Sequence, residues 1–236
     1  MSFWARLLEI VGDTASDAIS RVIEAVRTLF EGDPETRRKV AFSVAMIALS
    51  AKMAKADGIV SHAEVRAFRD IFAIPPDEET NVARLYNLAK QDVAGFEHYA
   101  ARLATLCNNG DRNCLLLEDI LDGLFHIAKA EGAVHEKELA FLHRVAEIFR
   151  IDEDHFRRIM ARHVFIDGFD PYLVLGVTRE TDLGEIKRRY RLAIAENHPD
   201  RLIARGVPEE FITIATDRTA KLNAAYEAIE RDRVAA

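Results

Sequence analysis

Residues 183–200 read LGEIKRRYRLAIAENHPD. Four apolar side chains recur at helical spacing and predict a face turned toward a core: Ile186, Tyr190, Ala193 and Ile194. Three basic side chains fall on another face and predict a positive stripe: Lys187, Arg188 and Arg191. The helix has to end before Pro199, because the residue preceding a proline is pushed out of helical geometry. The stretch therefore predicts a basic amphipathic helix that leads into a stiff, exposed His198-Pro199-Asp200 turn.

The sequence around this stretch carries further helix signals. Start and stop signals precede it: Asp170, Pro171, Gly176, Asp182 and Glu185. Asp before Pro begins a helix, Gly ends one, and Asp three residues before Glu has the spacing of a capping box. Residues 221–229 (KLNAAYEAI) continue the helical pattern. We therefore expect a helical hairpin with a short leading helix over residues 167–236.

An internal repeat lies upstream of the hairpin. Residues 54–61 read AKADGIVS and residues 128–135 read AKAEGAVH, and a glutamate follows each copy at the matching place, Glu64 or Glu138. Strand signals are scarce in this region. Each copy reads as helix, tight acidic-glycine turn and helix, so we expect an all-α bundle with an internal two-fold repeat over residues 31–166.

The repeat turns admit two interpretations. Their carboxylates could converge on a hard cation: Asp57, Glu64, Glu131 and Glu138. Their spacing does not match a calcium-binding EF-hand loop. Alternatively, Gly58 and Gly132 take the left-handed conformation that ends a helix, and Ser61 with Glu64 caps the next one. Capping covers more of the pattern, and we predict no metal ligands.

The repeat also resembles a known domain. The pattern Asp-Gly-x-Val-Ser-x-x-Glu at residues 57–64, with a helix on each side, resembles the TerB-like all-helical domain. A TerB-like domain joined to a C-terminal J domain is the arrangement of the DjlA family of membrane-associated, DnaJ-like proteins. The resemblance implies amphipathic N-terminal helices over residues 1–30, a TerB-like domain over residues 31–166 and a J domain over residues 167–236.

The J-domain resemblance rests on four segments besides His-Pro-Asp. Residues 172–177 match the opening Y-x-x-L-G-V, residues 185–191 match E-I-K-x-x-Y-R, and residues 223–227 match the closing N-x-A-Y-E. Residues 201–210 are similar to the loop peculiar to the DjlA branch. The sequence departs from the pattern at Glu196 and Asn197, where many J domains carry a basic residue and an aromatic one.

The resemblance implies a co-chaperone rather than an enzyme, with no catalytic residue and no cofactor of its own. It implies that His198, Pro199 and Asp200 contact a DnaK-type chaperone and stimulate its ATPase. Basic side chains would steer that docking. The predicted partner-binding residues are His198, Pro199, Asp200, Lys187, Arg188, Arg191 and Arg201.

Two other functions are compatible with parts of the sequence. The helical domain could be an acidic, metal-sensing stress-response scaffold with the J domain as an accessory. A His198-Asp200 acid–base enzyme is a third hypothesis, but the sequence offers it neither a nucleophile nor a phosphate loop.

Composition bounds the partners and the location. The net charge of -7 argues against a general nucleic-acid binder. No run of about 20 apolar residues is present to span a membrane, so we expect a soluble, cytoplasmic protein. Apolar stripes in residues 1–30 could pack on the next domain, lie peripherally on the cytoplasmic membrane or mediate self-association. Client proteins remain unidentified.

The sequence contains two cysteines, Cys107 and Cys114. If one continuous helix carried both, they would lie two turns apart, too far for an easy disulfide. We therefore expect two reduced, mostly apolar side chains.

Overall fold

The computed structural model describes residues 34–57, 66–68, 76–77, 79–91, 95–105, 113–164, 169–204, 207 and 211–235. All regular secondary structure within these residues is helical, which confirms the all-α prediction. The helices expected in residues 1–30, and most of the first repeat turn, lie outside the described residues.

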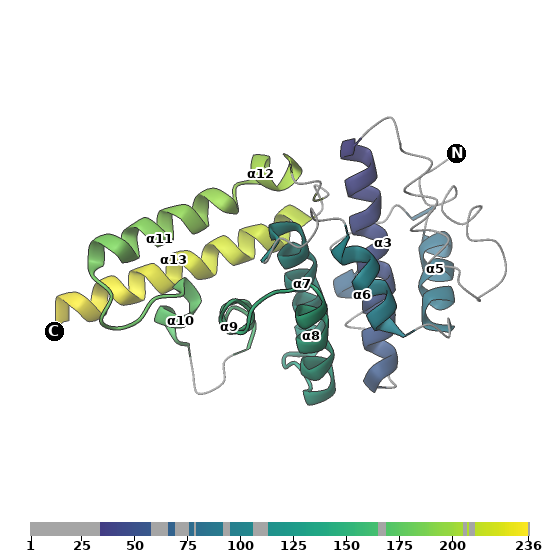
Figure 1. The fold of residues 1–236 in the computed structure, drawn as a ribbon, viewed down its shortest axis with the longest axis horizontal. Helices are drawn as coiled ribbons and strands as arrows, with labels where there is room; N and C mark the ends of the chain where they lie inside the picture. The colour runs from purple at the N-terminus through teal and green to yellow at the C-terminus, as the bar shows by residue number, and fades with distance from the viewer. Residues whose placement is uncertain are drawn as a thin grey trace.

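The N-terminal part is a bundle built around α3 (Pro34–Asp57). Figure 1 shows α3 beside α5 (Glu79–Gln91), α6 (Phe96–Ala104) and α7 (Leu115–Ala128), and it also contacts α8 (Glu136–Ile148). Every side chain from Phe42 to Ala54 is buried. A helix that is buried on all sides belongs in the middle of a core, which explains why α3 has no polar face in this stretch.

The second repeat turn behaves as a cap. The short 3-10 helix η1 (Lys129–Glu131) ends at Gly132, whose φ of 99° is left-handed. The backbone N–H of His135 donates to the buried carboxylate of Glu138 at 2.8 Å and so starts α8. This confirms the capping interpretation for this copy. Among the residues that the structure describes, no three His, Cys, Asp or Glu side chains gather in a way that could hold a metal ion.

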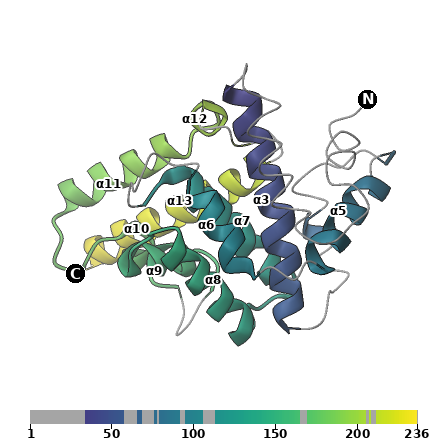
Figure 2. The same ribbon diagram turned by 45° about the vertical axis from the view of Figure 1, so that its right-hand side comes forward.

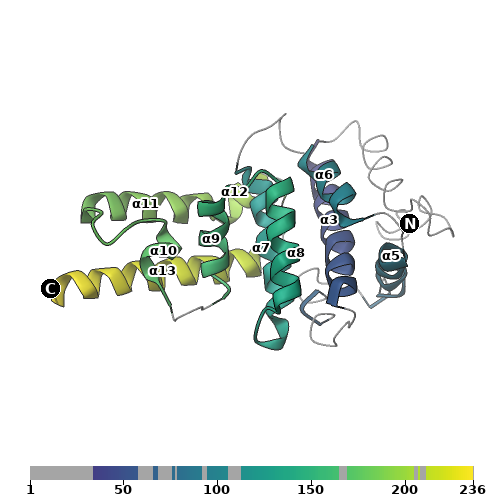
Figure 3. The same ribbon diagram turned by 60° about the horizontal axis from the view of Figure 1, so that its bottom comes forward.

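The C-terminal part is a hairpin of long helices. After α9 (Glu153–Ala161), the chain forms α10 (Pro171–Leu175), α11 (Leu183–Glu196), α12 (Pro199–Ala204) and α13 (Ile212–Ala235). Figures 1 and 3 show α11 and α13 lying side by side in opposite directions. Their shared core contains Tyr172, Val174, Leu175, Val177, Ile186, Leu222, Ala225 and Ile229.

The helix boundaries in the hairpin follow the predicted signals. Asp170 accepts a hydrogen bond from the backbone N–H of Tyr172 at 3.0 Å, and Gly176 closes α10 with a left-handed φ of 63°. Asp182 accepts one from the N–H of Glu185 at 3.1 Å and caps α11. These local contacts confirm the sequence-based capping predictions.

The hairpin is embedded in the bundle at one end. Figures 1 and 2 show the N-terminal end of α13 against the bundle helix α7, and the two helices are in contact. The bundle core takes in side chains from the hairpin: Leu202, Val207, Phe211, Ile214 and Ala215. Phe211 packs edge-on against Phe42 with ring centroids 4.6 Å apart. Gly123 makes room for it, because a Cβ there would lie 2.3 Å from the Phe211 Cζ. We call α3 to α9 the N-terminal bundle and α10 to α13 the C-terminal hairpin.

The cysteine prediction is wrong at Cys114, which forms a disulfide. Cys114 is the N-cap of α7, which begins at Leu115, and its backbone is extended, so no continuous helix runs through it. Separately, none of the described helices combines the length and the apolar character that crossing a membrane requires.

Candidate functional site

The His198-Pro199-Asp200 turn leads from α11 into the start of α12 and faces solvent. The side chains of His198 and Asp200 are 61% and 87% exposed. Pro199 is the first residue of α12, where its missing N–H costs nothing. The backbone N–H of Asp200 donates to the His198 Nδ1 at 3.3 Å, which ties the His198 ring to the first turn of α12. The turn is exposed, as expected, and both polar groups are available to a partner.

The predicted basic stripe is exposed on α11, but one member is already paired. The guanidinium of Arg188 donates to both oxygens of Glu185, at 2.7 and 2.8 Å. Arg189, which the sequence analysis left out of the stripe, donates to the same carboxylate at 2.9 Å. Hydrogen bonds from Arg188 and then Arg189 lower the pKa of Glu185 to about 2. Lys187 and Arg191 are exposed beside them.

A buried arginine lies directly beneath the turn. Arg218, on α13, donates through Nε and Nη2 to Asp122 at 3.0 and 2.9 Å. Its Nη1 donates to Asp119 at 2.9 Å and to the Asn197 side-chain oxygen at 2.7 Å. Burial alone would lower the pKa of Arg218, but Asp122, Asp119 and Glu118 raise it well above its ordinary value. The guanidinium therefore stays charged and joins the bundle to the residue preceding His198.

Helix α7 carries a third buried carboxylate, Glu118, which contacts an arginine and a histidine. Glu118 accepts hydrogen bonds from Arg162 at 2.9 Å and lies 2.8 Å from the His155 Nε2. Burial raises the pKa of Glu118, but His155, Arg162 and Arg218 together hold it far below its usual range. The buried ionic cluster consists of Glu118, Asp119, Asp122, His155, Arg162, His163 and Arg218.

His163 sits in this cluster as a neutral imidazole. Its ring stacks on Phe125 with centroids 5.2 Å apart, and its Nε2 lies 2.8 Å from the Asp122 Oδ1. Burial lowers the pKa of His163 to about 4, although Asp122 opposes the shift. Asp122 itself would have its pKa raised by burial, but Arg218, His163 and Arg162 hold it well below the usual value. Because an ionised carboxylate only accepts, the Nε2 carries the hydrogen.

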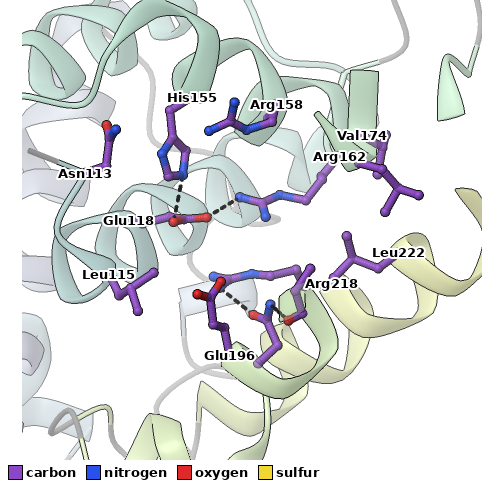
Figure 4. A pocket seen from close by; sticks show the side chains of 13 residues that line it. Asn113, Leu115, Glu118, His155, Arg158, Arg162, Val174, Glu196, Arg218 and Leu222 are labelled. Atoms are coloured by element: carbon purple, nitrogen blue, oxygen red, sulfur yellow. Dashed lines mark hydrogen bonds and ion pairs between the residues drawn. The ribbon is translucent and has the colours of Figure 1, made fainter. Parts of the chain in front are cut away.

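A cavity of about 370 Å³ opens between the bundle and the hairpin beside this cluster. Figure 4 shows His155 and Arg162 pointing toward Glu118 from one side, with Arg218, Glu196 and Leu222 on the other. The lining carries charges of both signs, and two of its members, Arg162 and Glu118, form an ion pair at 2.9 Å. Among the described residues, the lining contains no Ser, Thr, Cys, Lys or Tyr side chain.

The sequence analysis missed the acidic side of the cluster and Arg218. A signal was present: residues 115–125 read LLLEDILDGLF, a strongly apolar helix that carries three carboxylates. Carboxylates are almost never buried unless they are paired. An apolar helix with embedded acids therefore predicts buried cations elsewhere in the chain, although not which ones.

The fold and the exposed turn together define an all-helical bundle that carries a His-Pro-Asp hairpin. Residues 43–161 match the family of the tellurite resistance protein TerB. The chain is 28% identical to the co-chaperone protein DjlA of Photobacterium profundum, over 83% of this chain and 79% of the relative. It is 28% identical to that of Coxiella burnetii, over 77% and 73%, and 25% identical to that of Legionella pneumophila, over 85% and 80%.

No solved structure matches the chain significantly. The chain belongs to the TerB family through its bundle, and it is similar to DjlA co-chaperones over most of its length.

Proposed function

We propose that this protein is a J-domain co-chaperone that binds a DnaK-type chaperone and stimulates its ATPase. The observation that carries the proposal is the His198-Pro199-Asp200 turn, exposed at the end of a basic helix in a chain whose relatives are DjlA co-chaperones. The J domain covers residues 167–236. The TerB-like domain, residues 31–166, provides targeting or regulation, and residues 1–30 contact the membrane periphery or a second copy.

The chemistry of the surface supports docking rather than catalysis. His198 and Asp200 present an exposed ring and an exposed carboxylate that a partner can bind. Lys187 and Arg191 on α11 and Arg201 on α12 add exposed positive charge on the two helices that flank His198. Such charge raises the rate of encounter with an acidic patch and fixes the register of docking. The rate of ATP hydrolysis rises because docking favours the hydrolysing conformation of the partner.

Steady-state ATP hydrolysis by a DnaK-type chaperone tests this function. Wild type should stimulate hydrolysis, whereas His198→Gln and Asp200→Asn should abolish the stimulation while keeping the helical circular dichroism signal. His143→Gln and Asp154→Asn are matched controls, because they make the same chemical changes at exposed sites on α8 and α9. These controls should stimulate like wild type. Full stimulation by His198→Gln, or none by folded wild type with a peptide client present, would contradict the proposal.

A further inference from the structure

The His198-Pro199-Asp200 turn is exposed, but the residues on both sides of it are buried. Asn197 comes directly before His198 and is 8% exposed, and Leu202 follows Asp200 by two residues and is 2% exposed. Leu202 is buried in the core of the N-terminal bundle, and Asn197 is bonded to Arg218, which two aspartates of the bundle hold. We propose that Arg218 is a positioning residue for this turn, through which the N-terminal bundle controls docking of the partner chaperone. The inference rests on the proposed function for its partner.

On the preceding side, a single side chain links the turn to Arg218. The Asn197 Nδ2 donates to the carbonyl oxygen of Ala193 at 2.7 Å and so closes the last turn of α11. The Asn197 Oδ1 accepts from the Arg218 Nη1 at 2.7 Å. Both hydrogen-bonding ends of this amide are therefore used, and the backbone that enters His198 is fixed relative to α13.

Arg218 carries that constraint into the bundle. The Arg218 Nη1, which donates to Asn197, also donates to Asp119. The Nε and Nη2 of the same guanidinium donate to Asp122. Both aspartates lie on α7, at the centre of the bundle. A planar, forked guanidinium has fixed donor directions, so a displacement of α7 relative to α13 has to move or break the bond to Asn197.

On the following side, α12 is anchored in the bundle core. Leu202, Val207 and Phe211 are all buried in the same hydrophobic cluster as Phe42. The N–H groups of Arg201 and Leu202 donate to the carbonyl oxygen of His198 at 2.9 and 3.1 Å. The anchored helix therefore also holds the His198 peptide, and the turn is fixed at both ends.

This arrangement explains the departure from the J-domain pattern at residue 197. Asn197 is turned inward at that place and bonded to Arg218. When the bond is lost, the turn samples orientations that cannot dock. A protein whose competent state is only partly populated binds with an apparent affinity reduced by that fraction, while saturation still gives the full effect.

Asn197→Ala is the most direct test, because it removes the link to the turn and leaves the bonds of Arg218 to both aspartates intact. The concentration needed for half-maximal ATPase stimulation should rise about 3- to 10-fold with the maximum unchanged, unlike His198→Gln, which removes the maximum. Asn223→Ala is the matched control, since Asn223 also makes a buried-side hydrogen bond, to the Tyr190 hydroxyl at 2.9 Å, but lies away from the turn. It should leave both parameters unchanged.

A double-mutant cycle with Asp119→Asn tests whether the bundle acts through Arg218. If it does, Asp119→Asn raises the half-maximal concentration on its own but adds little to Asn197→Ala, because the path is already broken. Additive effects of the two substitutions, or an effect of Asn223→Ala equal to that of Asn197→Ala, would overturn the proposal.

Amide hydrogen exchange in the full chain gives a readout that needs no chaperone. Asn197→Ala should speed exchange at the Arg201 and Leu202 amides by about tenfold, while Asn223→Ala leaves them protected. If the Arg201 and Leu202 amides stay equally protected in Asn197→Ala, the positioning role is wrong, even where the co-chaperone activity is confirmed. Conversely, lost protection in a protein that stimulates no DnaK-type chaperone upholds the link to the bundle and contradicts only the proposed partner.

Discussion

The outer face of α11 and the buried face of α7 use the same kind of ion pair in opposite environments. Arg188 and Glu185 are 2.7 Å apart, with side chains 66% and 30% exposed. Arg218 and Asp122 are 2.9 Å apart, with side chains 5% and 1% exposed. The distances are nearly equal, but water screens the first pair and not the second. Two ion pairs of nearly equal length should therefore differ in their contribution to stability. In the proposed function, the outer face serves to bind a partner, whereas the buried pair holds the bundle and the hairpin together.

Replacing the buried cation should have the largest effect. Arg218→Met leaves Asp119 and Asp122 buried without their main partner, which should destabilise the protein by about 3 to 5 kcal/mol. Arg188→Met is the matched control on the outer face and should cost less than about 1 kcal/mol. Urea denaturation followed by circular dichroism measures both. Equal losses for the two variants would break the comparison.

Lowering the pH should destabilise the protein first through the buried ionic cluster, because His163 lies in it. Its pKa is lowered to about 4 in the folded protein, so the unfolded chain binds the proton first as the pH falls. Stability should therefore drop between about pH 6.5 and 4, by up to roughly 1.4 kcal/mol per pH unit. Below that window, Glu118 and Asp122 add to the loss because their folded pKa values are also lowered.

Urea denaturation of wild type and His163→Gln at pH 7, 5.5 and 4 measures this effect. The variant should be less stable at pH 7 and show a flatter decline, so that the difference between the two proteins shrinks toward pH 4. Parallel declines would mean that His163 does not carry the pH dependence.

Filling the space at Gly123 should disturb the joint between bundle and hairpin more mildly. A Cβ at this position meets the Phe211 ring at 2.3 Å, so Gly123→Ala should cost about 1 to 3 kcal/mol from overpacking, offset by the better helix propensity of alanine. Gly95→Ala is the control, because the nearest atom there, at 2.8 Å, belongs to the flexible Glu97 carboxylate. Thermal unfolding compares them. A Gly123→Ala protein as stable as wild type would show that Phe211 moves aside freely.

The smallest effect on stability should come from replacing the basic side chains on the outer face of α11. The same replacements should have a larger effect on the rate of association with the partner chaperone. Lys187→Gln with Arg191→Gln should change the unfolding free energy by less than about 0.5 kcal/mol. The same pair of changes should slow association with a DnaK-type chaperone several-fold at low salt, and less at 0.5 M salt because screening already removes the attraction. Stopped-flow association measures the rate. A salt-independent loss would point to direct contacts instead of steering.

Local signals predicted local structure well in the hairpin. The helix stop before Pro199, the cap at Asp182 and the left-handed Gly176 depend on neighbours a few residues away, and all are present. Gly132 and Glu138 followed the same rule in the second repeat turn. The cysteine prediction was wrong at Cys114 because it assumed a continuous helix, which α6 and α7 do not form.

The sequence by itself determined the helices, their caps and the exposed His198-Pro199-Asp200 turn, since these depend on chain chemistry within a turn or two. Only the tertiary structure decided that Arg218 meets Asp119 and Asp122 and that Phe211 enters the bundle core. In the sequence, Arg218 lies 99 residues from Asp119 and 96 residues from Asp122. Their pairing follows from how two helical bodies pack, because a buried charge is stable only where the fold brings its counter-charge.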